Sequence, residues 1–144
     1  MAKNGFTLLE LLLSVVIIVI VFGLTIPVLQ SFQSKNDLDV AIVTTAQSLR
    51  RAQSLAQASD GDSAWGVYIQ SGSITMFKGS TYVGHNSSTD ETFTLPSDIN
   101  PATTTQIIFN KFSGLPTATS IINLTSNNNV TKTITINSKG TVSY

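Results

Sequence analysis

The chain has 144 residues, no cysteine and a formal net charge of zero at pH 7, and only 11% of its residues are charged. This length suits one compact domain with an appendage. The lack of cysteine excludes disulfides, thiol chemistry and cysteine-ligated zinc. The zero net charge gives no electrostatic reason to expect nucleic acid or an acidic membrane surface as the partner.

Composition changes sharply along the chain. Residues 11–34 contain no charged side chain, whereas the chain after about Ser59 is rich in Ser, Thr, Asn and Gly. A helix over Leu11–Leu29 would be long enough for a bilayer, which needs about 20 apolar residues. A cleaved secretory signal is disfavoured because no small-residue cleavage site follows Val21. A permanent single-span anchor and a helix buried in protein both remain open.

Three residues interrupt this apolar run. Glu10 lies near its start, where a carboxylate in hydrocarbon would cost a few kcal/mol. Pro27 removes a backbone hydrogen bond and tends to kink a helix, and Gly23 weakens the same stretch by about 1 kcal/mol relative to Ala. We expect a bend near Gly23–Pro27.

Residues 35–58 have helical periodicity. Their apolar positions recur at intervals of four and three, which places them on one face packed against a sheet. These residues are Leu38, Ile42, Thr45, Leu49, Ala52 and Ala56. Gly61 is a candidate stop for this helix. The two apolar segments together predict one long helix.

Beyond Gly61 the hydrophobic period changes to two. Trp65–Ile69, a turn at QSGS and Ile74–Phe77 predict a hairpin. Further strands are expected at Tyr82–Val83, Phe93–Leu95, Gln106–Phe112, Ser120–Thr125 and Val130–Asn137. Five to seven antiparallel strands packed on the second half of the helix predict an α+β domain.

Catalytic and metal-binding signals are weak. His85 is the only histidine and lies in a Gly/Asn/Ser loop, so no Ser-His-Asp triad can be assigned. The stretch Ser59–Ser63 (SDGDS) lacks the spaced ligands of a calcium loop. Asp90–Glu91 is expected at the surface and Trp65 in the core. We therefore predict a protein that is not an enzyme and needs no cofactor or metal.

The stretch Gly5-Phe6-Thr7-Leu8-Leu9-Glu10, with Lys3 before it and an apolar run after it, resembles the class III signal of type IV pilins and type II secretion pseudopilins. The resemblance implies cleavage after Gly5 by a prepilin peptidase and methylation of the new Phe6 amine. It also implies the pilin fold, in which a long helix is followed by a β-rich domain. Family filaments often melt this helix near the position of Pro27.

The resemblance also implies a role for Glu10 in assembly. Pairing Glu10 with the Phe6 amine of a neighbouring subunit would neutralise two charges that are expensive in a low-dielectric setting. The alternative is that Glu10 lies in the headgroup zone without a specific role. Apolar packing between subunits would then hold the filament core together. The expected assembly residues beside Glu10 are Leu8, Leu9, Leu12 and Val16.

The C-terminal third resembles, more weakly, the end of GspH/FimT-type minor pilins. The matching features include Phe109, Gly114 and a Gly-x-Val sequence at Gly140–Val142 near the end of the chain. Thr141 lies where that pattern typically has Arg. Because some FimT-like pilins take up DNA, a minor pilin whose β-domain binds DNA or a surface ligand is the alternative function. Its candidate contacts are Lys111, Lys132 and Lys139.

Together these observations predict a leader at 1–5, a transmembrane and assembly helix at 6–34, and a globular domain at 35–144 whose β-rich region covers 64–144. The predicted function is that of a structural filament subunit. Its expected partners are other pilins, prepilin peptidase, inner-membrane assembly machinery and the lipid bilayer. We expect it in the inner membrane before assembly and in a periplasmic or cell-surface filament afterwards.

Overall fold

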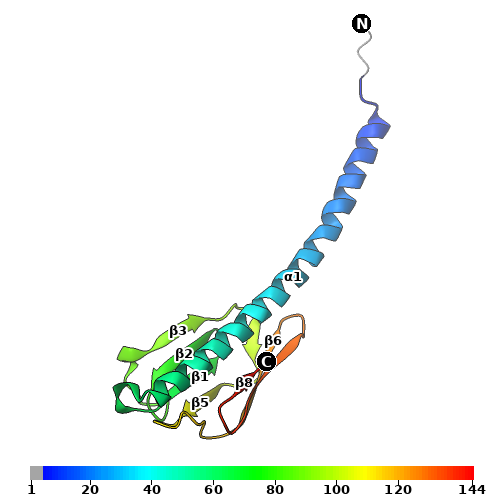
Figure 1. The fold of residues 1–144 in the computed structure, drawn as a ribbon. Helices are drawn as coiled ribbons and strands as arrows, with labels where there is room; N and C mark the ends of the chain where they lie inside the picture. The colour runs from blue at the N-terminus through cyan, green and yellow to red at the C-terminus, as the bar shows by residue number, and fades with distance from the viewer. Residues whose placement is uncertain (1–4) are drawn as a thin grey trace. The chain divides into compact units, whose positions relative to one another are not determined.

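The computed structural model describes residues 5–144, except for the side chains of residues 24–28. The chain divides into two compact units, Met1–Gln33 and Ser34–Tyr144. One helix, α1 (Leu8–Gln57), extends through both units, and all the described strands follow it (Figure 1). The α+β class with a long N-terminal helix is confirmed.

The predicted single long helix is also confirmed, because α1 has no break in its helical assignment. Gly23 is helical and exposed. Pro27 belongs to residues 24–28, whose side chains lie outside the described residues. The bend expected near Gly23–Pro27 therefore stays a prediction.

The strands of the second unit form two antiparallel four-stranded sheets. The first sheet has the order β3-β2-β1-β5 and consists of β1 (Trp65–Gln70), β2 (Ser73–Lys78), β3 (Glu91–Thr94) and β5 (Thr105–Phe109). The second has the order β4-β6-β7-β8 and consists of β4 (Ile99–Pro101), β6 (Ser120–Ser126), β7 (Thr131–Ile136) and β8 (Val142–Ser143). The predicted hairpin is β1–β2, paired from Trp65–Lys78 to Gln70–Ser73.

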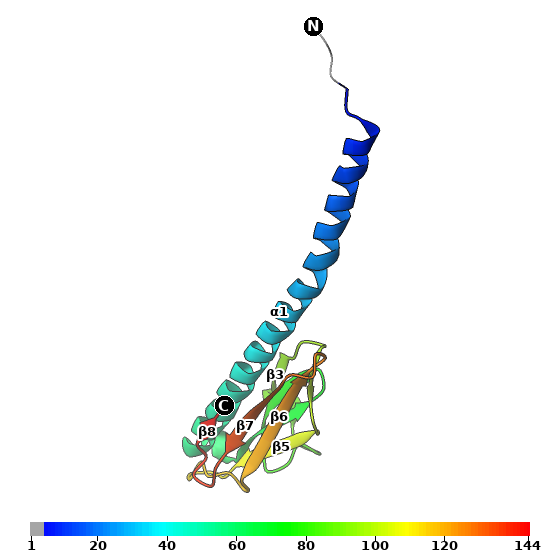
Figure 2. The ribbon, with the colours of Figure 1, turned by 90° about the vertical axis from the view of Figure 1, so that its right-hand side faces the viewer.

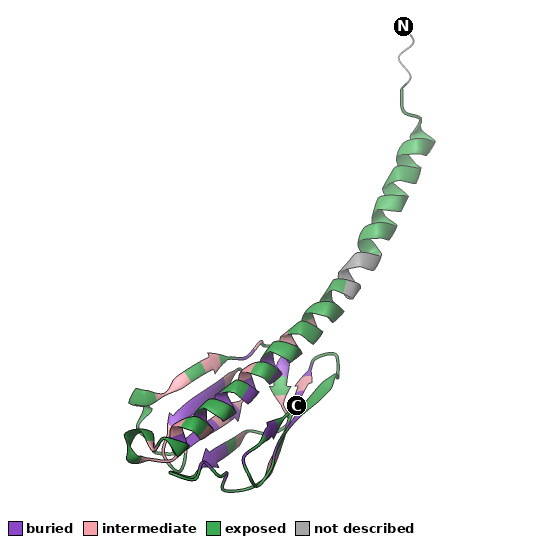
Figure 3. Cartoon of the chain, in the orientation of Figure 1, coloured by how far each residue is buried: buried purple, intermediate pink, exposed green. Residues whose placement is uncertain are grey.

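One hydrophobic core joins the second half of α1 to both sheets. All six residues predicted on the buried helix face are at most 2% exposed, and the buried parts of the helix and strands appear in purple in Figure 3. Four of the buried helix positions are alanines, at 41, 46, 52 and 56. Small side chains at these positions let the strands approach the helix backbone closely. The expectation that Trp65 is a core residue is confirmed, because it is 5% exposed.

Two strands and one loop differ from the sequence prediction. The short strands β4 and β8 were not predicted, because each is two or three residues long and forms only by pairing with β6 or β7. The strand expected at Tyr82–Val83 is wrong, since these residues form a bend and a turn. The Tyr82 side chain packs on the sheet: its ring stacks on that of Tyr68 with centroids 3.8 Å apart.

The C-terminal end of α1 is fixed by two close-packed glycines. Gln53 Nε2 donates a hydrogen bond to the Gly114 carbonyl oxygen at 3.1 Å. A Cβ atom built on Gly140 would lie 2.2 Å from Gln53 Nε2, and one on Gly114 would lie 2.3 Å from Gln57 Cγ. Both glycines have positive φ, a conformation that other residues rarely adopt. The backbone at these two turns can therefore lie directly against the helix.

We predict that Gly140→Ala destabilises the fold by about 2–3 kcal/mol, because it adds left-handed strain and displaces the Gln53 amide from its hydrogen bond to Gly114. Gly72→Ala is the matched control: its φ of +82° is close to the +80° of Gly140, but no atom lies within 4 Å of its added Cβ. It should cost only the strain, about 1–2 kcal/mol. Denaturant unfolding of the full chain in detergent, followed by Trp65 fluorescence, measures both. Equal losses would show that packing against the helix contributes nothing at Gly140.

Candidate functional site

The N-terminal helix start combines a capping residue with an acid. The backbone N–H of Glu10 donates to the Thr7 carbonyl oxygen at 3.1 Å and to the Thr7 hydroxyl at 3.3 Å. Thr7 is therefore the N-cap of α1, and Thr7-x-x-Glu10 has the spacing of a capping box. This capping signal is present in the sequence, but the prediction for Glu10 rested only on its charge in an apolar run.

The Glu10 carboxylate itself is exposed. Among residues 5–144 it has no hydrogen-bond or ion-pair partner, although a carboxylate in the first helical turn interacts favourably with the helix dipole. Gly5 and Phe6 precede the helix, are exposed and belong to no helix or strand. The segment thus places an accessible peptide bond and an unpaired carboxylate about one helical turn apart.

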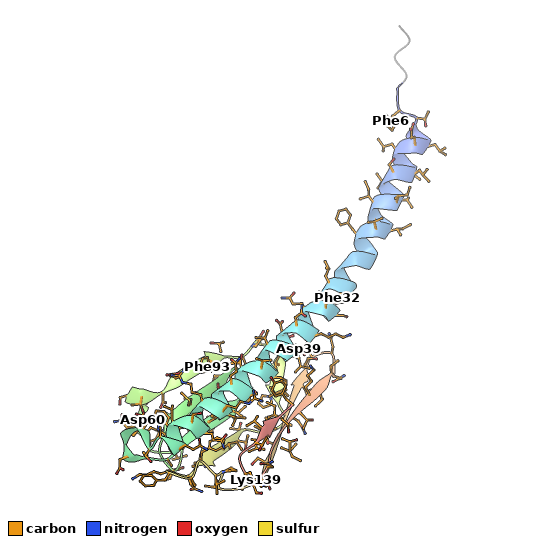
Figure 4. The ribbon with its side chains drawn as sticks, viewed as in Figure 1. Phe6, Phe32, Asp39, Asp60, Phe93 and Lys139 are labelled. Carbon is orange, nitrogen blue, oxygen red and sulfur yellow. The ribbon has the colours of Figure 1, made fainter. Side chains whose placement is uncertain are left out.

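Apolar side chains surround the helix between Phe6 and Phe22. Every large hydrophobic residue there is exposed, from 45% at Val16 to 83% at Leu8. Figure 4 shows their side chains projecting from all sides of the helix. The predicted assembly residues Leu8, Leu9, Leu12 and Val16 all belong to this surface. A helix that is hydrophobic all round is normally buried in protein or lipid, so this surface requires a partner outside its own chain.

No stretch of helix whose residues are fully described is both long enough and apolar enough to cross a membrane.

Two of the three lysines considered for nucleic acid are paired with acids. Lys111 hydrogen-bonds to Asp62, and this hydrogen bond lowers the pKa of Asp62. Lys132 hydrogen-bonds to Asp39 on α1. Lys139 is exposed in the turn before β8, without an acidic partner among the residues described. These pairs neutralise two of the three candidate phosphate contacts, and DNA binding stays a prediction.

His85 forms a nearly buried cluster that the sequence did not predict. Its side chain is 9% exposed, and its Nε2 lies 2.8 Å from the Asp90 carboxylate. Its Nδ1 lies 2.5 Å from the Tyr82 carbonyl oxygen. Because a carboxylate and a carbonyl only accept hydrogen bonds, both ring nitrogens donate when His85 is protonated. The expectation that Asp90 is a surface residue is wrong, since its side chain is 15% exposed.

The cluster holds the loop between β2 and β3 against the first sheet. The His85 ring stacks on Tyr82 with centroids 4.8 Å apart and lies 5.2 Å from the Phe77 ring. Both ring nitrogens are occupied by structural partners, so neither is free to act as a base. The hydrogen bond to Asp90 is the main cause that raises the pKa of His85 above its usual 6.5, against the opposing effect of burial.

We predict that this cluster makes stability depend on pH. A raised histidine pKa contributes stability that is fully present below pH 6.5 and is lost as the pH rises through the folded-state value. The free energy of unfolding should therefore fall between pH 6 and pH 9. His85→Phe, which keeps an aromatic ring but cannot titrate, should flatten this dependence. Chemical unfolding of both proteins across this range is the measurement, and an unchanged slope in the variant would contradict the prediction.

Comparison with known proteins gives one match and two negative results. Residues 1–26 match the family described as the prokaryotic N-terminal methylation motif. No curated protein and no solved structure matches the chain. The match covers Gly5, Phe6 and Glu10, the residues on which the resemblance was based, and it does not reach the region compared with GspH/FimT-type pilins. The matched motif lies at the start of a long helix whose second half packs on antiparallel sheets, an arrangement similar to that of type IV pilins and pseudopilins.

Proposed function

We propose that this protein is a structural subunit of a type IV pilus or type II secretion-like filament, assembled through its N-terminal helix. The observation that carries the proposal is the methylation motif at residues 1–26 at the start of a helix whose apolar side chains are exposed on every side. Neighbouring subunits would cover these side chains. The β-rich domain, which has its own core, would remain at the filament surface.

Processing would prepare the helix for assembly. A prepilin peptidase would hydrolyse the peptide bond between Gly5 and Phe6, leaving a carboxylate on Gly5 and an amine on Phe6. The exposure of both residues supports access by a peptidase. Methylation would leave the Phe6 amine basic, so that it carries a positive charge at the start of an apolar segment.

The new amine of one subunit would pair with Glu10 of its neighbour. Glu10 has no partner among the described residues, and it lies at the end of the helix where the amine is created. Inside a filament, a single unpaired charge is strongly destabilising, whereas a pair is much less costly. Because an apolar helix can slide along its neighbours, this pair would also set the axial register of the subunits.

Before assembly, the apolar segment would be held in the inner membrane. This part of the proposal depends on the motif and on the uncharged stretch 11–34. Lipid would cover the same side chains that other subunits cover later. Release from the membrane therefore exchanges one apolar environment for another and exposes little apolar surface to water.

Mass spectrometry of the native protein tests the processing step. We expect a mature chain that begins at Phe6 and carries one methyl group on its amine. A Gly5→Val variant should accumulate with residues 1–5 retained, because a branched side chain replaces glycine beside the cleaved bond. A native chain that retains Met1–Gly5 would rule out processing at this site.

Filament incorporation tests the role of Glu10. Glu10→Gln should lower the amount of subunit in sheared filaments at least about tenfold, because it leaves the neighbour's amine buried without a counter-charge. Thr7→Ala is the matched control: it removes the N-cap hydroxyl but keeps the carboxylate, and should cost only about 1 kcal/mol of helix stability. Immunoblots of filaments and membranes measure both variants. Equal loss in the two would mean that Glu10 acts by starting the helix and not by pairing.

A further inference from the structure

The two sheets of the globular unit differ in how their outer faces are covered. The loop between β2 and β3 lies over the first sheet, where the rings of Tyr82 and His85 pack on Tyr68 and Phe77. No described residue of Ser34–Tyr144 covers the outer face of β6 and β7 in the same way, and its side chains are exposed or half-buried. Figure 2 shows these two strands side by side.

This open face carries no charge. Its cross-strand pairs are Ile121 with Thr135, Asn123 with Thr133, and Thr125 with Thr131. Lys132 lies on the opposite side of β7, where it pairs with Asp39 of α1. Five of the six residues on the outer face therefore present a hydroxyl or an amide, and the sixth is an exposed isoleucine.

Hydrogen bonds between the strands fix the polar groups in place. The Thr133 hydroxyl donates to Asn123 Oδ1 at 2.9 Å, and the hydroxyls of Thr125 and Thr131 are 2.9 Å apart. Among the residues described, the Asn123 amide nitrogen has no acceptor. Threonine side chains are β-branched, and cross-strand hydrogen bonds already hold several of these groups in place. They therefore lose little conformational entropy when a ligand binds. The face is a preorganised array of groups that both donate and accept.

A groove of about 540 Å³ lies at one end of this array. It is lined by Ser120, Ile121 and Thr135 together with the adjoining Thr119, Ile136 and Asn137. Ile121 is 69% exposed and supplies an apolar patch beside the hydroxyls. The size lies within the range of small-molecule sites.

We propose that the outer face of β6 and β7 binds a neutral polysaccharide. Nucleic acids and acidic polymers need Lys or Arg, which this face lacks. A protein partner would need a buried apolar centre, and Ile121 alone does not provide one. A sugar chain presents many hydroxyls that must regain hydrogen bonds when they lose water, together with C–H surfaces that suit the exposed isoleucine. The combination of paired hydroxyl and amide groups with one apolar side chain matches that chemistry.

Affinity electrophoresis of the full chain in detergent tests the proposal. Native gels are cast with hydroxyethyl cellulose or dextran as neutral polymers, with polygalacturonate as an anionic polymer, or without polymer. We expect at least one neutral polymer to retard the chain and polygalacturonate to leave its mobility unchanged. Because the assay needs no filament, a negative result would leave the proposed filament function untouched.

Variants locate the binding face. The double variant Asn123→Ala/Thr133→Ala should bind about thirtyfold more weakly, since it removes two side chains that would each hydrogen-bond the polymer. Thr94→Ala, an exposed threonine on β3 of the other sheet, is the matched control and should bind normally. Thermal unfolding of each variant checks that the fold is intact. The proposal is overturned if neither neutral polymer retards the chain, if only polygalacturonate does, or if the double variant binds as well as the control.

Discussion

The apolar side chains on the first half of α1 must be covered by something other than water, and the proposed function depends on what covers them. Between Phe6 and Phe22 the large apolar side chains point in every direction, so no single packing face of its own chain could bury them. Lipid and a bundle of identical helices are the two surroundings that cover such a surface. The methylation motif at residues 1–26 overlaps this surface. Glu10 adds a polar group at the one end where a charged amine would be created.

The apolar face of the second half of the same helix is buried by the chain's own strands. One face is buried in the core that it shares with both sheets, and four alanines on that face bring the strands close to the helix backbone. At the helix end, Gly114 and Gly140 allow turns to lie directly against Gln53 and Gln57. The sheets therefore pack on a part of the helix that does not overlap with the exposed apolar half. This separation lets the domain fold without covering the apolar surface proposed for assembly.

The two sheets differ in whether their outer face is covered by other parts of the domain or open to solvent. At the first sheet, stacked rings and the pair formed between His85 and Asp90 hold a loop over the outer face, so that side is covered. The second sheet presents threonine and asparagine side chains to solvent without a charge among them. In a filament, a face of this kind would be repeated at every subunit that carries it. Weak contacts with a polymer would then add up through multivalency.

The sequence by itself determined the elements whose signals are local. These are the methylation motif, the long helix with its buried face from Leu38 to Ala56, and the hairpin from Trp65 to Lys78. They follow from residue order because hydrophobic periodicity acts over a few neighbouring positions. Tertiary structure decided what depends on distant partners. Strands β4 and β8 exist only through pairing, Asp90 is sheltered only because His85 and the aromatic rings meet it, and two lysines are neutralised by acids on distant elements. The open polar face also required the register of β6 against β7, which aligns Asn123 with Thr133. These contacts join residues far apart in the sequence and form only when the shared core packs. Local sequence patterns do not specify them.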